Sequence, residues 1–461
     1  MIELTLDEIA RAISGELVAG DPTSSVSGTV DTDSRNLGAG DIFFAKLGAN
    51  DDGHRYLHEL TERGIGLAVV SEPNLELATA QIVVDDTVVA LSLLADFVLS
   101  RVRERSELTV IGITGSNGKT STRAMLEAVL ENNGETVAPI NSYNNEVGLP
   151  LTVLKLSLDT KYLILEYGAA GVGSIESLAR WTRPDIGVQL KVGMAHAGEF
   201  GGIEQTAQIK AELMPYITGA AIMNFDDSRV REFPFKGETI GFGFSADSSV
   251  RLVSTQISLS GTAIKLEAFG QQHEVLLRIL GEHQAMNLAA TIAVAARLEL
   301  DVSKALAAIS KLEMAERWRM QLIESPAGYS VINDAYNASP DSMRAALQTL
   351  ATLGRQGHRT VAILGEMAEL GEFSAEEHDA IGRLVVRLNI DQLFVVGQGA
   401  KLIHMAATQE GSWDGESEFI DSINSAFELI HAKLLPGDVV LVKASNVAGL
   451  RFLGDELAGV A

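Results

Sequence analysis

The sequence contains no cysteine. Disulfide bonds, thiolate metal sites and cysteine nucleophiles are therefore excluded. It also lacks any apolar run of about 18 residues or more, the length that a membrane-spanning helix requires. The segment Met1–Glu8 has early acidic residues and no basic region, so it does not predict a secretory signal. We therefore expect a cytoplasmic protein without membrane insertion.

Positive charge is also scarce. Lysine and arginine total 36 against 61 aspartates and glutamates, which gives a formal net charge of −25. Binding to nucleic acid or to an anionic membrane needs a basic face, so neither partner is expected. An acidic substrate would need a local basic pocket. The 461 residues are 46% hydrophobic, which is enough for the cores of two to four domains.

The apolar pattern changes along the chain. Near the N-terminus, short apolar runs at residues 42–45 and 66–70 flank a helical segment at 56–63, and a helix at 88–105 follows. Further on, short continuous apolar runs alternate with helical stretches. Such runs predict mostly parallel strands that are buried on both faces.

The expected strands fall into two further sections. The first has strands at 108–113, 162–165, 186–190 and 220–223, antiparallel strands at about 248–280, and a helix at 286–298. The second has strands at 329–332, 360–364, 392–396 and 439–442. We predict an α/β protein of three domains: a small α/β domain (1–85), a central P-loop ATPase-type domain (86–313) and a Rossmann-like domain (314–461).

A glycine-rich segment follows the strand at 108–113 and opens a helix. It consists of Gly115, Ser116, Asn117, Gly118, Lys119, Thr120 and Ser121. Glycines allow backbone amides to surround phosphates, and the helix N-terminus adds partial positive charge. Lys119 can neutralise phosphate charge and the Thr120 hydroxyl can bind Mg²⁺. Because residue 113 is isoleucine, the loop is a variant of the usual pattern. By itself it indicates a nucleoside triphosphate, and a kinase, GTPase, motor or ligase would all fit.

Other polar residues lie after the next strands. Glu166 ends one strand and could hold Mg²⁺, although a glutamate there is often solvated. His196 is a possible metal ligand, but a hydrogen-bonded histidine fits equally. Lys210 on its own indicates a solvated helix lysine. The segment 141–146 is a polar loop that could reach a substrate, and Asp334 could bond a ribose or form part of a helix-start turn.

Taken together, these motifs resemble the Mur ligase family, which builds the peptide of peptidoglycan, over nearly the whole chain. Residues 114–120 resemble its ATP loop, and Gly281–Asn287 resembles its segment near the adenine. Residues 317–321 resemble the start of its third domain. The segments 334–343, 364–371 with His378, and 144–148 resemble the branch that adds D-alanyl-D-alanine.

The resemblance implies ATP and Mg²⁺ as cofactors, and UDP-N-acetylmuramoyl-tripeptide and D-alanyl-D-alanine as substrates that join through an acyl phosphate. The first domain would bind the muramoyl substrate, the second ATP and the third the dipeptide. We expect a monomer with a carbamylated Lys210. The tripeptide could end in L-lysine or diaminopimelate.

The resemblance also assigns roles to residues. The catalytic residues would be Lys119, Glu166, His196 and Lys210, and the metal ligands Thr120, Glu166, His196 and Lys210. The nucleotide would contact the loop residues 115–121, His283, Asn287, Arg319 and Asp334. The other substrates would contact Ser34, Arg35, His54, Asn144, Asn145, Tyr336 and Asn337.

The sequence departs from the family pattern at three positions. Gly171 stands where a histidine is usual, Lys191 where asparagine is common, and Ala197 where leucine is usual. Two other interpretations remain. One is a regulatory P-loop protein that uses ATP as a switch, and the other is a related ligase acting on a folate or a cyanophycin-like polymer.

Overall fold

The structure is a computed structural model that describes residues 1–48, 51–140, 143–194, 197–314, 316–411 and 416–460. The chain folds into two compact units. The first comprises residues 1–113, 130–187 and 216–219, and the second comprises residues 114–129, 188–215 and 220–461. None of the helices in the described ranges is long and apolar enough to cross a membrane.

The first unit begins with a small α/β fold. Its sheet has the strand order β2-β7-β6-β5-β4, formed by Glu16–Ala19, Gln81–Val83, Leu67–Val70, Ile42–Phe44 and Val30–Asp31. Strands β4 to β7 are parallel and β2 is antiparallel to β7. A short antiparallel pair, β1 and β3 (Leu4–Thr5 and Ser25–Val26), precedes it. The helices are α1 (Leu6–Ala12), α2 (Leu57–Glu62) and α3 (Thr87–Arg105).

Local sequence explains these elements. All three residues of β5 are buried, as expected for a parallel strand covered on both faces. Asp86 caps the N-terminus of α3, because its carboxylate accepts hydrogen bonds from the amides of Val88 and Val89. The predicted helix at 56–63 forms as a 3₁₀ turn, Gly53–Tyr56, followed by α2.

The first unit also contains parallel strands in the order β8-β10-β9, formed by Thr109–Thr114, Thr160–Glu166 and Glu135–Val137. Helices α5 (Gly148–Val153) and α6 (Ser174–Thr182) belong to it. Strand β11 (Ile186–Gln189) continues from the first unit into the second. Most of helix α4 (Lys119–Leu130) and all of helices α7 (Ala197–Phe200) and α8 (Ile203–Ala211) belong to the second unit.

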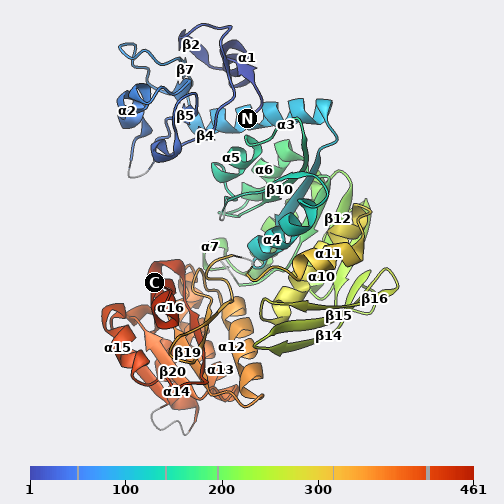
Figure 1. The fold of residues 1–461 in the computed structure, drawn as a ribbon, viewed down its shortest axis with the longest axis vertical. Helices are drawn as coiled ribbons and strands as arrows, with labels where there is room; N and C mark the ends of the chain where they lie inside the picture. The colour runs from blue at the N-terminus through green and yellow to red at the C-terminus, as the bar shows by residue number, and fades with distance from the viewer. Residues whose placement is uncertain (49–50, 141–142, 195–196, 315, 412–415, 461) are drawn as a thin grey trace. The chain divides into compact units, whose positions relative to one another are not determined.

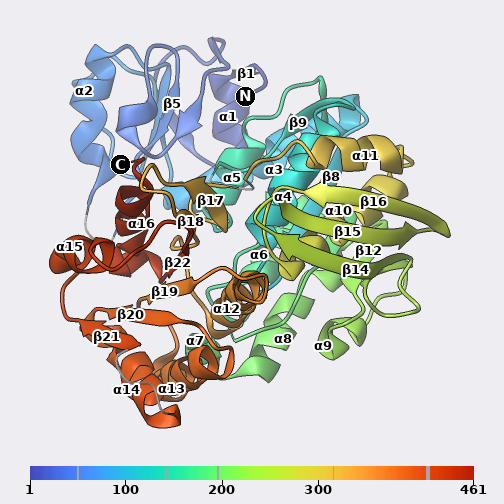
Figure 2. The same ribbon diagram turned by 60° about the horizontal axis from the view of Figure 1, so that its bottom comes forward.

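The second unit contains strands in the order β16-β15-β14-β13-β12, formed by Gln271–Leu277, Gly261–Ala268, Val250–Ser258, Glu238–Gly243 and Ala220–Asn224. Strands β12 to β14 are parallel, whereas β14, β15 and β16 form the predicted antiparallel strands. Helix α10 (Glu282–Arg297) runs along β14 and β15 (Figure 2). Helices α9 (Ser228–Arg231) and α11 (Val302–Ile309) complete this part.

The C-terminal sheet of the second unit has the order β17-β18-β22-β19-β20-β21. Its strands are Gln321–Glu324, Ser330–Asn333, Val439–Lys443, Thr360–Leu364, Gln392–Val396 and Ser417–Ile420. All pairs are parallel except β17 with β18. Helices α12 to α16 are Pro340–Gly354, Ser374–Arg387, Lys401–Glu410, Ala426–His431 and Leu450–Ala458. Helices α15 and α16 cover one face of the sheet and α12 covers the other (Figure 1).

Candidate functional site

The glycine-rich segment forms a tight loop between β8 and α4. Gly115 and Gly118 have φ angles of 150° and 90°, a region that favours glycine. A Cβ atom on Gly118 would lie 2.5 Å from Asn287 Oδ1, so this position also needs the space. Lys119 begins α4 and its Nζ donates to the Gly115 carbonyl at 2.7 Å. The loop therefore has the compact backbone that a phosphate-binding loop requires.

The segment after β11 holds this loop in place. The Leu190 amide donates to the Thr114 carbonyl at 3.0 Å, and the Ser116 amide donates to the Lys191 carbonyl at 2.8 Å. The Gly193 amide then donates to Ser116 Oγ at 2.9 Å. These bonds tie the loop to the segment after β11, so the protein itself maintains the conformation of the loop.

A pocket of about 650 Å³ lies beside the loop, entirely within the second unit. This volume falls in the range of about 300–1,000 Å³ for small-molecule sites. Asn117, Gly118 and Lys191 line one part of it, and Phe242 and Met286 contribute apolar surface. His283, Asn287, Asp341, Gln348 and Thr349 also line it. A pocket with polar groups at a phosphate loop and apolar groups elsewhere fits a nucleotide.

His283 and Asn287 lie on the first turns of α10 at this pocket. Burial lowers the pKa of His283 to about 4, so its ring is neutral at physiological pH. Asn287 Nδ2 donates to Gln284 Oε1 at 3.0 Å, and its Oδ1 faces Gly118. The structure thus brings these two predicted residues next to the phosphate loop.

Lys210 lies on α8 and is 3% exposed. Burial, and secondarily the charge of Lys119, hold the pKa of Lys210 well below its usual value. The interpretation of Lys210 as a solvated helix lysine is therefore wrong. Lys210 shares the buried side of α8 with Thr206, Ala207 and Ile209, whereas Glu204 and Gln208 are exposed. Among the predicted catalytic residues, Lys119 and Lys210 are thus close enough to interact electrostatically.

Glu166 belongs to the first unit. It ends β10, is fully buried, and pairs in register with Ile113 of β8, the residue before Thr114. The Thr120 hydroxyl is also buried. Mg²⁺ prefers hard oxygen donors, and each of these two residues by itself carries an oxygen group of that kind.

The predicted ligand His196 lies outside the described residues. Across the part of the chain that the structure describes, no three His, Asp or Glu side chains gather to hold a metal ion.

The predicted muramoyl-binding residues Ser34, Arg35 and His54 lie in the N-terminal fold after β4 and β5. Ser34 is buried, whereas the Arg35 side chain is 85% exposed and pairs with Asp33. His54 Nδ1 lies 2.7 Å from Asp52 Oδ1, and its Nε2 accepts from the Ser71 amide at 3.0 Å. Both ring nitrogens of His54 therefore contribute to the local fold, while Arg35 presents its guanidinium to solvent.

Asn144 and Asn145 precede α5 in the first unit. The Gly168 amide donates to the Asn144 carbonyl at 2.8 Å, two residues after Glu166. Asn145 Oδ1 accepts from the Gly148 amide at 2.9 Å, at the start of α5. Burial raises the pKa of the adjacent Tyr143, and the charges of Asp31 and Asp33 add to the shift. The asparagine loop thus lies between the end of β10 and the Asp33–Arg35 turn.

Arg319, Asp334, Tyr336 and Asn337 come together in the C-terminal part of the second unit. The guanidinium of Arg319 lies 4.5 Å from the centre of the Tyr336 ring. Asp334 Oδ1 accepts from the Met320 amide at 3.0 Å. Trp318 and Met320, on either side of Arg319, have φ angles of 62° and 49°. These positive φ angles cost energy, and the bond from Met320 to Asp334 helps to maintain them.

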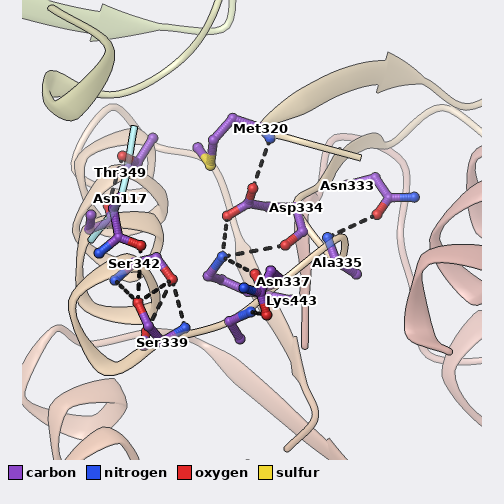
Figure 3. A network of polar contacts seen from close by, with 12 residues as sticks. Asn117, Met320, Asn333, Asp334, Ala335, Asn337, Ser339, Ser342, Thr349 and Lys443 are labelled. Carbon is purple, nitrogen blue, oxygen red and sulfur yellow. Dashed lines mark hydrogen bonds and ion pairs between the residues drawn. The ribbon is translucent and has the colours of Figure 1, made fainter. Parts of the chain in front are cut away.

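Lys443 organises this group and was not predicted. It ends β22, is buried, and its Nζ donates to Asp334 Oδ2 at 2.5 Å and to the Asn337 carbonyl at 3.0 Å (Figure 3). A third, longer contact of 3.4 Å reaches the Asp334 carbonyl. The sequence signal was a lysine at the end of an apolar strand, where the carboxyl ends of parallel strands carry ligand sites.

The substitution Lys443→Met is expected to destabilise the protein by about 3 kcal/mol, because it leaves the Asp334 carboxylate, which is 14% exposed, without its partner. Adding Asp334→Asn should recover most of this loss, since no unpaired charge then remains. Thermal unfolding of the two variants beside the wild type measures both effects. Equal destabilisation by the single and double substitutions would contradict this role of Lys443.

The fold and the pocket define a P-loop nucleotide-binding α/β protein, and comparison with known proteins identifies its family. The model of the Mur ligase middle domain matches residues 113–295. The model of the Mur ligase, glutamate ligase domain matches residues 318–446, and that of the Mur ligase family, catalytic domain matches residues 28–98. The chain belongs to the Mur ligase family.

Individual relatives are similar over almost the whole length. A UDP-N-acetylmuramoyl-tripeptide--D-alanyl-D-alanine ligase of Mycobacterium tuberculosis (strain ATCC 25618 / H37Rv) is 40% identical, with 99% of this chain and 98% of the relative covered. A crystal structure of MurF from Acinetobacter baumannii has a TM-score of 0.89 and 28% identity, with 99% of both chains covered. MurF ligase from Thermotoga maritima in complex with ADP has a TM-score of 0.82 and 27% identity, with 94% of this chain and 99% of that chain covered.

Proposed function

We propose that the chain is an ATP-dependent ligase that joins D-alanyl-D-alanine to UDP-N-acetylmuramoyl-tripeptide in peptidoglycan precursor synthesis. The observation that carries this proposal is the phosphate loop beside a nucleotide-sized pocket, in a chain 40% identical to the mycobacterial ligase over 99% of its length. The ADP complex of the Thermotoga relative supports ATP as the nucleotide.

The proposed reaction has two steps. The terminal carboxylate of the tripeptide attacks the γ-phosphorus of ATP, which forms an acyl phosphate and releases ADP. The amine of D-alanyl-D-alanine then attacks the acyl carbon, inorganic phosphate leaves, and the amine loses a proton. The protein contributes positioning and charge stabilisation. Lys119 would stabilise the charge that develops on the transferred phosphoryl group.

We further propose that Lys210 is carbamylated. A lysine with a lowered pKa is more often neutral, and its amine can then add to CO₂ and lose a proton to give a carbamate. Burial of Lys210 would shield the carbamate from water. Its oxygens, together with Thr120, Glu166 and His196, would hold Mg²⁺, which when bound neutralises phosphate charge.

Each domain would bind one substrate. Residues 1–85 would bind the UDP-muramoyl group, with Arg35 as an exposed cation for an anionic substrate. Residues 86–313 would bind ATP, and residues 314–461 would bind the dipeptide near Tyr336 and Asn337. Nucleotide-linked precursors and ATP are intracellular metabolites, so a location in the cytoplasm fits this proposal. We also propose that the enzyme is a monomer.

Phosphate release from ATP and Mg²⁺ in the presence of UDP-muramoyl tripeptide tests the proposal. We expect release to require both the tripeptide and D-alanyl-D-alanine, and to yield a pentapeptide by mass spectrometry. Parallel assays with tripeptides ending in L-lysine and in diaminopimelate identify the third residue. Release without either substrate would contradict the proposal and favour an ATP-driven switch. No release with any tripeptide would also contradict the proposal, and other carboxylic acids would then be tested as substrates.

A further inference from the structure

Lys191 lines the pocket beside the phosphate loop. It follows β11, lines the pocket with Asn117 and Gly118, and its carbonyl holds the amide of Ser116. Its side chain is 53% exposed. The backbone of Lys191 thus supports the phosphate loop, while its side chain remains half exposed at the pocket.

The ammonium group of Lys191 is paired with Asp341. Lys191 Nζ lies 3.3 Å from Asp341 Oδ1, and Asp341 Oδ2 accepts from the Met194 amide at 2.7 Å. Asp341 lies in the first turn of α12 and is 22% exposed. The carboxylate is thus anchored by its backbone bond, whereas the lysine is held by one long contact on a flexible side chain.

Asp341 places a negative charge next to the phosphate loop. A Cβ atom built on Gly193 would lie 2.5 Å from Asp341 Oδ2 and 3.6 Å from Ser116 Cβ, so both residues border the same glycine. Ser339, which caps the N-terminus of α12, donates from its Oγ to Asn117 Oδ1 at 3.2 Å. A carboxylate at this place would repel the phosphates of a nucleotide unless a cation balanced it.

We propose that Lys191 is an additional cation for the phosphate groups of the nucleotide, held by Asp341 until the nucleotide binds. The ammonium group then interacts with the phosphates as well as with Asp341 and compensates for the nearby carboxylate. This inference rests on the proposed binding of ATP and extends it to a second lysine at the pocket. It makes Lys191 a positioning residue for the nucleotide, in addition to Lys119.

Calorimetric titration with ADP and Mg²⁺ tests the proposal, because it measures binding without turnover. Lys191→Asn should weaken ADP binding about three- to tenfold, as expected for one half-exposed charge acting on a multiply charged group. Lys191→Arg should retain most of the affinity. Asp341→Asn should tighten binding about two- to threefold, since the lysine is then released to the phosphates. In steady-state assays, Lys191→Asn should raise KM for ATP and leave kcat nearly unchanged.

Lys265→Asn is the matched control. Lys265 is 62% exposed and pairs with Glu274 on the antiparallel strands, so the substitution removes the same charge outside the pocket. ADP affinity should not change in this variant, and the effect of Lys191→Asn should shrink at high salt.

Unchanged ADP affinity in Lys191→Asn would overturn the inference. So would equal weakening by Lys191→Asn and Asp341→Asn, which would show that the ion pair merely connects two segments. If the wild type binds ADP and Lys191→Asn binds it equally well, only this inference fails. If the wild type binds no ADP, the proposed function fails as well.

Discussion

Replacing Lys119 by methionine is expected to lower kcat/KM for ATP by at least about 10³-fold, the scale of losing a principal cation in phosphoryl transfer. Lys119 begins the helix after the phosphate loop, and its Nζ already lies at the loop, 2.7 Å from the Gly115 carbonyl. Methionine preserves the length of the side chain but removes its charge. Steady-state phosphate release measures the loss, and circular dichroism establishes that the variant is folded.

Lys401→Met provides the comparison for Lys119. Lys401 is an exposed lysine that begins α14, so the substitution repeats the chemical change at the start of another helix. Its kcat/KM should equal that of the wild type. A Lys119 variant that kept more than a tenth of the wild-type kcat/KM would mean that the loop binds phosphate through its backbone without the lysine.

Replacing Lys210 by alanine should lower kcat by about 10²–10³-fold, if the carbamate supports the metal beside the phosphates. Removal of a buried side chain also leaves a space that a small carboxylate can enter. Acetate or formate is therefore expected to restore part of the activity, because its oxygens replace those of the carbamate. Removal of dissolved CO₂ should reduce wild-type activity. Lowering the pH should do the same by protonating the amine, although the lowered pKa of Lys210 moves this loss to a lower pH than for an ordinary lysine.

Two controls separate carbamylation from a structural role of Lys210. Lys304→Ala removes an exposed helix lysine on α11 and should leave kcat unchanged. Intact-mass analysis under gentle conditions should show an added carboxyl group on the wild type and none on the Lys210 variant. A folded Lys210→Ala enzyme with normal kcat would contradict the metal-supporting role.

Buried strands were predicted closely from sequence. The expected strands at 360–364 and 392–396 coincide with β19 and β20, because a strand covered on both faces is a continuous apolar run. Strands β13 (Glu238–Gly243) and β21 (Ser417–Ile420) were missed. Both contain polar residues, and β21 lies at the edge of its sheet. Whether such a segment forms a strand depends on its pairing with a neighbouring strand rather than on its local composition.

The candidate site was likewise predicted only in part. The phosphate loop was predicted because its residues are consecutive and its glycines are visible in the sequence. The partnership of Lys443 with Asp334 was not, because 109 residues separate the two, and 150 residues separate Lys191 from Asp341. Single-sequence patterns carry no information on such contacts. Whether Asp334 also bonds a ribose stays a prediction.

The position of β22 has a consequence for synthesis on the ribosome. It is the strand latest in the sequence, yet it lies between β18 and β19 inside the C-terminal sheet. Until it emerges, the apolar edges of β18 and β19 have no strand to join them, and such edges promote aggregation in a nascent chain. The same strand ends with Lys443, which holds the Asp334–Asn337 loop. A chain released before β22 would therefore lack the polar network of the site, so the network forms only as the sheet is completed.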